Sequence, residues 1–156
     1  MLSRRDDGFE IDTDPGRLDV RRTHEWLSTD AYWALGRPRH VTNRAIEGSL
    51  CFGVYGPDGV QVGFARAVTD YATFAWLCDV YVDRAVRGRG LGTWLAQTVR
   101  EHLLGLVPRI VLATADAHGV YAKAGFTPFA EPQRWMEIDL RPLPRIGDRQ
   151  GDVAHT

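Results

Sequence analysis

A turn in the middle of the chain combines residue types that are suited to binding an anion. It contains three alternating glycines and three arginines, Gly88, Gly90, Gly92, Arg84, Arg87 and Arg89. Glycines let backbone N–H groups approach a ligand closely. A helix that begins at such a turn adds unpaired amides and the positive end of its dipole. The residues therefore predict an anion site, and phosphate is its usual ligand.

Two familiar phosphate-binding motifs do not fit this turn. The dinucleotide fingerprint requires Gly-x-Gly-x-x-Gly, whereas the spacing here is Gly-x-Gly-x-Gly. The P-loop requires Gly-Lys followed by Ser or Thr, and the sequence has no such tripeptide. The pattern that fits is Arg87-x-x-Gly90-x-Gly92, which follows a strand-like run ending at Val82. An ordinary left-handed turn before a helix is the simpler alternative.

A carboxylate lies in the apolar run from Ala75 to Val82, just before the turn. Asp79 is costly to bury in such a run without a purpose. Burial would raise its pKa and make it a better general base. An aspartate that pairs with an arginine or bonds to the backbone is the alternative.

The hydrophobic pattern predicts strands and helices that place these residues in one α/β domain. Strands are expected over 9–13, 50–55, 60–69, 71–82, 109–113, 126–130 and 133–140, and helices over 18–27, 40–48, 88–106 and 116–123. The element order is βααβββαβαββ. Residues 1–140 would form a single domain, and the polar segment 141–156 would be a flexible tail.

Two local motifs, in this element order, resemble the GNAT acyltransferase superfamily. The turn is similar to its Arg/Gln-x-x-Gly-x-Gly/Ala pyrophosphate loop. Tyr121-Ala122-Lys123-Ala124-Gly125-Phe126 is similar to its Tyr-x-x-x-Gly-Phe signature. The resemblance covers about residues 9 to 140. It implies the GNAT fold, a central mixed sheet that splays between its fourth and fifth strands and is flanked by helices.

The resemblance also implies an N-acetyltransferase that moves an acetyl group from acetyl-CoA to an amine by direct attack in a ternary complex. Tyr121 would reprotonate the CoA thiolate, and Asp79 or a water relay would deprotonate the amine. Acetyl-CoA would be held by the strand end, the turn and the helix start, through Val80, Tyr81, Val82, Arg87, Gly88, Arg89, Gly90, Leu91, Gly92 and Thr93. Alternatively, Tyr121 is a core residue that packs beside Phe126. The alternative for the whole chain is a non-catalytic acyl-CoA-binding sensor or structural module of the same fold.

The acceptor is expected to be a small-molecule or peptide amine that enters past the first two helices. The connection between those helices carries Tyr32 and Trp33, whose rings could clamp an apolar or cationic group. Asp70 or Asp79 could attract an ammonium. The two aromatic residues could equally cover the core.

Composition excludes several other classes of protein. The 156 residues carry a net charge of −1, so there is no basic field to attract nucleic acid. No apolar stretch approaches the roughly 20 residues of a membrane span, and a cytoplasmic protein is the simplest expectation. Cys51 and Cys78 lie in apolar runs without metal-type spacing, so we expect free thiols and no metal. A homodimer is compatible with the sequence but is not indicated by it.

Overall fold

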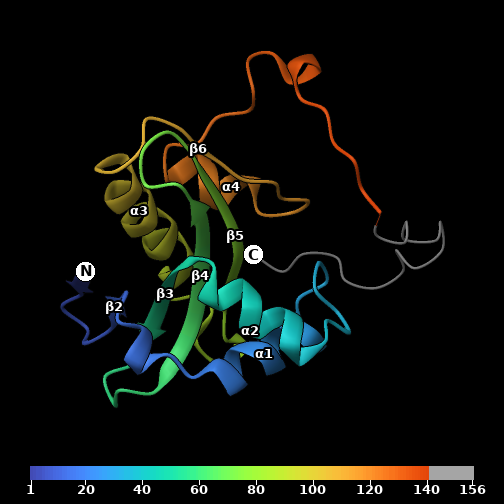
Figure 1. The fold of residues 1–156 in the computed structure, drawn as a ribbon. Coiled ribbons are helices and arrows are strands. Elements are labelled where there is room, and N and C mark those ends of the chain that lie inside the picture. The colour runs from blue at the N-terminus through green and yellow to red at the C-terminus, as the bar shows by residue number, and fades with distance from the viewer. Residues whose placement is uncertain (141–156) are drawn as a thin grey trace. The chain divides into compact units, whose positions relative to one another are not determined.

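Six strands form one sheet whose spatial order follows the chain. The structure is a computed structural model that describes residues 1–140. The strands are β1 Leu2–Arg4, β2 Glu10–Asp12, β3 Leu50–Tyr55, β4 Gln61–Thr69, β5 Ala75–Val82 and β6 Ile110–Val111. Neighbours from β1 to β5 pair antiparallel, whereas β6 is parallel to β5 (Figure 1). The sheet is therefore mixed, as the resemblance predicted.

Helices follow the predicted segments closely. They are α1 Val20–Thr29, α2 Arg39–Glu47, α3 Leu91–Leu104 and α4 His118–Lys123, with 3₁₀ turns η1 Pro15–Arg17, η2 Arg84–Val86 and η3 Pro132–Arg134. Asp19 begins α1, because its carboxylate accepts a hydrogen bond from the amide of Arg22. Contacts divide the chain after Phe126, and the site described below lies within Met1–Phe126.

The helices of this unit cover both faces of the sheet (Figure 1). On one face α3 packs through Leu95, Val99 and Leu103, which are fully buried. On the other face α1 packs through Trp26 and Leu27. The sheet is thus sandwiched between two apolar layers, and polar side chains inside either layer need specific partners.

A β-bulge interrupts the pairing of β4 with β5. Phe64 pairs with Tyr81 and Arg66 pairs with Cys78, so β5 has one residue more than β4 between these pairs. Asp79 lies at this bulge with φ +50°. The left-handed conformation costs most residues about 1–2 kcal/mol, although aspartate tolerates it better than others. The bulge therefore depends on its neighbours to stabilise it.

The sheet splays on the other side of β5. The pairing of β5 with β6 comprises only Ala75 with Ile110 and Trp76 with Val111. Beyond Trp76, within residues 1–140, β5 keeps β4 on one side and has no strand on the other. The splay predicted between the fourth and fifth strands is therefore confirmed; here these strands are β5 and β6, because β1 precedes them.

Two predicted strands, 126–130 and 133–140, are wrong. Among the described residues this segment contains only the turn η3. Its prolines at 128 and 132 cannot donate to a strand ladder. Met136, Ile138 and Leu140 alternate as a strand would, yet they are 96%, 93% and 93% exposed. Alternation does not make a strand where no neighbour pairs with it.

One strand was missed at the start of the chain. β1 pairs with β2 at the edge of the sheet, with Ser3 opposite Ile11. A three-residue strand is too short to give a periodic signal. The predicted tail, 141–156, lies outside the described residues.

Candidate functional site

The glycine turn leads into α3 with uncovered backbone amides. Gly88 and Gly90 have φ values of +81° and +72°, and Gly90 is the N-cap of α3. Within the described chain, no side chain caps this helix, and a methyl group placed on Gly88, Gly90 or Gly92 would meet no atom within 4 Å. The first turn of α3, which includes Leu91 and Thr93, therefore lacks a side-chain cap in residues 1–140, and the glycines beside it leave room for a ligand. This is the geometry that a phosphate group requires.

The arginines around the turn have different roles. The Nε of Arg87 donates to the carbonyl of Val82 at 2.9 Å, and its Nη2 lies 3.5 Å from Asp30. Arg84 also pairs with Asp30, its Nε lying 3.0 Å from Oδ2. These contacts fasten the turn to the end of α1. The side chain of Arg89 makes no hydrogen bond or ion pair within residues 1–140, so it is free to reach an anion.

The first hairpin supports the same turn from the other side. The Nη1 of Arg5 donates to the carbonyl of Arg89 at 3.2 Å. Its guanidinium also lies 5.3 Å from the ring centroid of Trp94, in the first turn of α3. The turn is therefore held by Arg5 from the first hairpin and by Asp30 from the end of α1.

The strand end proposed to contact acetyl-CoA borders the splay. Val80 packs partly buried on the α3 face, whereas the Tyr81 side chain is buried on the α1 face. The Tyr81 hydroxyl donates to Asp30 at 2.6 Å, and its ring stacks on Trp26. Only the backbone of Tyr81 can therefore serve a ligand in the gap. Val82, at the end of β5, pairs with Gly63 on the β4 side.

Tyr121 lies on α4 and packs partly buried against the α3 face, as does Val80. Its ring meets that of Phe126 edge-on with centroids 5.9 Å apart. Its hydroxyl makes no hydrogen bond in the described part of the chain, and it is not sealed from solvent. Burial, with smaller contributions from Tyr32 and Asp116, raises the pKa of Tyr121 to about 12. The phenol is therefore protonated at neutral pH and available as a donor.

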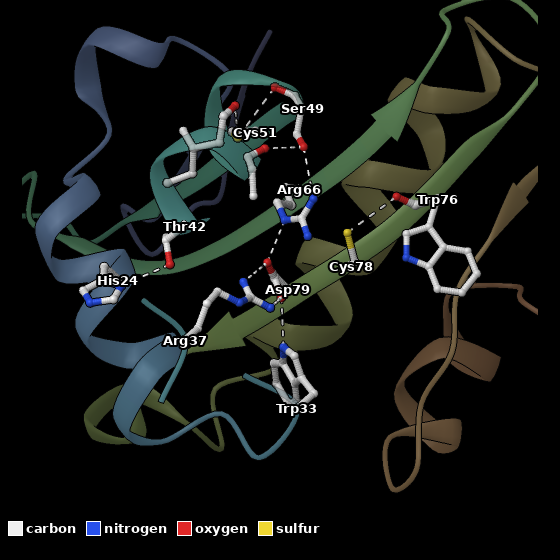
Figure 2. A network of polar contacts seen from close by, with 12 residues as sticks. His24, Trp33, Arg37, Thr42, Ser49, Cys51, Arg66, Trp76, Cys78 and Asp79 are labelled. Atoms are coloured by element: carbon white, nitrogen blue, oxygen red, sulfur yellow. Dashed lines mark hydrogen bonds and ion pairs between the residues drawn. The ribbon is translucent and has the colours of Figure 1, made fainter. Parts of the chain in front are cut away.

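Asp79 is the centre of a buried polar network (Figure 2). Its Oδ2 accepts hydrogen bonds from the Nε of Arg66 at 2.6 Å and the Nη1 of Arg37 at 2.7 Å. Its Oδ1 accepts from the Nη2 of Arg37 at 3.1 Å and the indole Nε1 of Trp33 at 3.0 Å. The carboxylate side chain is only 2% exposed.

The expectation that burial raises the pKa of Asp79 is wrong. Burial is the largest single influence and acts upward, but hydrogen bonds and charge from Arg37 and Arg66 outweigh it, and the pKa is lowered. A carboxylate with a lowered pKa and four donors is a poor base. The contacts favour the alternative of an aspartate paired with arginine at the splay.

The two aromatic residues of the α1–α2 connection lie beside this network. Their rings meet edge-on at 4.9 Å, and Tyr32 and Trp33 are 52% and 39% exposed. The Tyr32 hydroxyl accepts a hydrogen bond from the amide of Ala115 at 3.2 Å, which links the connection to the loop after β6. Both rings present surface to solvent beside the network of Asp79.

Asp70 does not join the site. Its carboxylate accepts hydrogen bonds from the Thr73 hydroxyl and from the amides of Ala72, Thr73 and Phe74. The Thr73 hydroxyl is the largest cause of its lowered pKa. Asp70 closes the turn before β5, and this role occupies the oxygens that were expected to attract an ammonium.

Arg37 and Arg66 were missed as site residues. A charged side chain inside the apolar strand Phe64-Ala65-Arg66-Ala67-Val68 is the same kind of signal that drew attention to Asp79. Either residue taken alone could face solvent. Opposite charges on adjacent predicted strands are the pattern that could have revealed the ion pair of Arg66 and Asp79.

Residues 1–140 contain neither a cluster of metal ligands nor a membrane-spanning helix. No group of three or more His, Cys, Asp or Glu side chains in residues 1–140 could hold a metal ion. None of the helices in that range has the length and apolar character required to cross a membrane.

Comparison with known proteins agrees with the fold and the motifs. The model of the acetyltransferase (GNAT) family matches residues 20–126. A candidate acetyltransferase of Gibberella zeae is 33% identical over 135 residues, which cover 74% of this chain and 76% of that protein. This chain therefore belongs to the GNAT acetyltransferase family.

Solved structures extend this result. A candidate acetyltransferase of the GNAT family from Xanthomonas campestris pv. campestris is 46% identical, with a TM-score of 0.78, and the match covers 88% of this chain and 95% of that one. Glucosamine-6-phosphate N-acetyltransferase from Arabidopsis thaliana is 13% identical, with a TM-score of 0.58 over 86% of this chain and 97% of that one. At that identity the second likeness concerns the fold alone.

Proposed function

We propose that the protein is an N-acetyltransferase that transfers an acetyl group from acetyl-CoA to an amine of a small molecule or peptide. The observation that carries this proposal is the combination of the open first turn of α3 with the unpaired edge of β5. The first suits a pyrophosphate group and the second suits an extended chain that carries amide groups. CoA has both parts in one molecule.

The residues present fit such a ligand. The three glycines leave a cradle that any side chain would fill, and the guanidinium of Arg89 is free to add a charge-assisted contact. The edge of β5 from Val80 to Val82 supplies backbone groups to the gap. In this proposal a backbone N–H at this edge stabilises the oxyanion that develops on the thioester carbonyl.

The transfer forms a bond between the amine nitrogen and the acetyl carbon and breaks the bond between that carbon and sulfur. The acylated nitrogen releases its extra proton to solvent. Tyr121 donates its phenolic proton to the departing thiolate and recovers one from solvent. Donation is uphill, because the pKa of Tyr121 is about 12 whereas a thiol has an ordinary pKa near 8.5.

The amine must lose its proton before it attacks. For an alkyl amine with a pKa near 10.4 this costs about 4–5 kcal/mol at neutral pH. Asp79 is engaged with two arginines, so we assign deprotonation to solvent. Asp79 then acts as a positioning residue that holds the bulge next to Val80.

A non-catalytic acyl-CoA-binding module is the second candidate, and the engaged state of Asp79 favours it. One experiment separates the two. Acetyl-CoA is titrated into the protein by calorimetry, and thiol release is then followed with a panel of amines. Binding followed by amine-dependent thiol release supports the transferase. Binding without release in any member of the panel supports the module, and absence of binding contradicts both.

A further inference from the structure

The network around Asp79 has one positive charge more than its carboxylate can neutralise. Arg37 and Arg66 both pair with Asp79, which is the one carboxylate within 4 Å of either guanidinium in residues 1–140. Their other polar partner, the hydroxyl of Ser49, is neutral. The Arg37 and Arg66 side chains are only 18% and 15% exposed, so solvent screens this excess charge poorly.

The neighbouring thiols do not supply the missing negative charge. Cys51 and Cys78 pair with Arg66 from the two adjacent strands. Burial raises the pKa of each thiol to about 11, against a smaller downward influence of Arg66. Both cysteines are therefore neutral at physiological pH, and the excess charge remains.

Part of the arginine pair is still available to a ligand. The Nε of Arg66 donates to Asp79 and its Nη1 donates to Ser49. Its remaining nitrogen, Nη2, donates no hydrogen bond within the described chain and is not sealed from solvent. An accessible guanidinium donor in a half-buried, positively charged position is suited to a carboxylate or phosphate.

An uncovered part of the sheet adjoins this donor. On the face of α1, three cross-strand pairs follow one another along β4 and β5. The first pair, Phe64 and Tyr81, is buried under α1. The next pair is Arg66 and Cys78 (Figure 2).

The third pair, Val68 and Trp76, lies beyond the cover of α1 and is 44% and 37% exposed. We call the exposed pair of Val68 and Trp76 the apolar platform. The positive charge of Arg66 thus lies at the border between this platform and the part of the sheet that α1 covers. This arrangement suits a ligand with an anionic group next to an apolar body.

The border also adjoins the reaction centre. Asp79 directly precedes Val80 on β5, at the edge where the acetyl group would lie. Neighbouring strands lie about 4.8 Å apart, so Arg66 on β4 is one strand removed from that edge. Trp33, which donates to Asp79, closes the same border from the α1–α2 connection.

We propose that Arg66 and Arg37 bind an anionic group on the acceptor amine, a carboxylate or a phosphate, while Val68 and Trp76 contact its apolar part. The inference rests on the proposed transferase and narrows its acceptors to amines that carry a negative charge, such as amino acids. Neutral and purely cationic amines are then poor acceptors, because they leave the excess charge of the pair uncompensated.

The test uses amines that differ only in this charge. L-Phenylalanine is compared with L-phenylalanine amide, and O-phosphoethanolamine with ethanolamine. The readouts are kcat/KM for thiol release from acetyl-CoA, and calorimetric binding of each amine to the protein saturated with CoA. We expect at least a tenfold preference for the anionic member of one pair, and the pair that shows it distinguishes carboxylate from phosphate.

Arg66→Gln should reduce that preference to near one, while Arg66→Lys should retain part of it. Arg66→Gln leaves a neutral pair of Arg37 with Asp79, so the fold keeps a balanced network. Arg21→Gln removes the same charge from an exposed position on α1 and should preserve the preference.

The outcomes separate this inference from the proposed function. Acetyl transfer without a preference for anionic amines, or with a preference that Arg66→Gln leaves intact, overturns the anion site and leaves the transferase standing. Anionic amines that bind through Arg66 without any transfer support the site and contradict the transferase. Absence of both binding and transfer overturns both.

Discussion

Arg66 on β4 donates its Nε to the carboxylate of Asp79 on β5 at 2.6 Å, across the bulge that separates the two strands' registers. The side chain that neutralises Asp79 thus also fixes a residue whose φ of +50° is unusual for a non-glycine. Val80 follows Asp79 at this bulge, on the part of β5 whose outer edge has no strand partner within residues 1–140. The ion pair and the open strand edge are therefore parts of one arrangement.

Asp79→Asn should lower the free energy of unfolding by about 3 kcal/mol, since it leaves two arginines with little compensation. Asparagine keeps the size of aspartate and its tolerance of the left-handed conformation, so the change isolates charge. Denaturant unfolding at pH 7 measures the loss. Asp6→Asn, at an exposed position, should change stability by less than about 0.5 kcal/mol.

The effect of Asp79→Asn should depend on pH in a defined direction. The pKa of Asp79 is lowered in the fold, so its stabilisation is present above the ordinary pKa of about 3.9 and is lost as pH falls further. The stability difference between wild type and variant should therefore shrink below about pH 4. A difference that stays constant from pH 7 to pH 3 would contradict the ion-pair explanation.

Gly92→Glu should abolish acetyl-CoA binding and leave the fold intact. Gly92 is the second residue of α3, has no positive φ, and offers a new side chain open space. A glutamate there adds negative charge where the pyrophosphate would lie, yet it suits the helix dipole and improves helix propensity. Calorimetry should show at least a hundredfold loss of affinity, while the unfolding midpoint stays level or rises.

Leu104→Glu is the matched control for this variant, because it places the same charge at the exposed far end of the same helix. It should leave acetyl-CoA affinity within about twofold of wild type. Unaltered binding in Gly92→Glu would show that the ligand does not use the first turn of α3.

The glycine turn, α3 and the three-strand meander could be predicted from the sequence because each has a strong local signal. The spacing of Gly88, Gly90 and Gly92 and the turn at Pro57-Asp58-Gly59 are short-range patterns. The roles of Asp79 and Asp70 could not be predicted in this way. Both are aspartates near β5, but one pairs with two arginines and the other closes a turn. That difference depends on distant partners.

In the segment after Phe126, a clear local pattern led to a wrong prediction. Its alternation of apolar residues up to Leu140 is a correct description of the sequence, yet a strand exists only where another strand pairs with it. β1 is the complementary case, since its three residues have little pattern and are ordered by pairing with β2. In both cases, the presence or absence of a pairing strand decided whether the segment forms a strand.

Tyr55→Phe should leave stability unchanged or raise it. The Tyr55 hydroxyl is buried and has no hydrogen-bond partner within residues 1–140, and an unpaired buried hydroxyl is unfavourable. The guanidinium of Arg17 lies 4.1 Å from the ring centroid, and phenylalanine keeps that contact. Denaturant unfolding at pH 7 measures the change. A loss of more than 1 kcal/mol would mean that the hydroxyl does have a favourable interaction.

The same variant should resist alkaline unfolding better than wild type. Burial raises the pKa of Tyr55 to about 12, whereas in the unfolded chain it is about 10. A group with a raised pKa stabilises the fold below the unfolded value, and that contribution is lost as pH rises from 10 to 12. Wild type should therefore lose up to about 1.4 kcal/mol per pH unit more than Tyr55→Phe in this window. Equal slopes would contradict the assignment.

Tyr121→Phe should slow amine-dependent thiol release by about tenfold or more, with acetyl-CoA affinity changed by less than about twofold. Phenylalanine keeps the edge-on contact with Phe126 and the packing on the α3 face, so only the hydroxyl is lost. Tyr71→Phe, at a tyrosine that is 56% exposed, should leave the rate unchanged. Steady-state kinetics of thiol release and calorimetry give the two readouts. Because the pKa of Tyr121 is about 12, its ionisation should not reduce kcat below about pH 10. A variant with wild-type kcat would remove Tyr121 from the mechanism and leave solvent to protonate the thiolate.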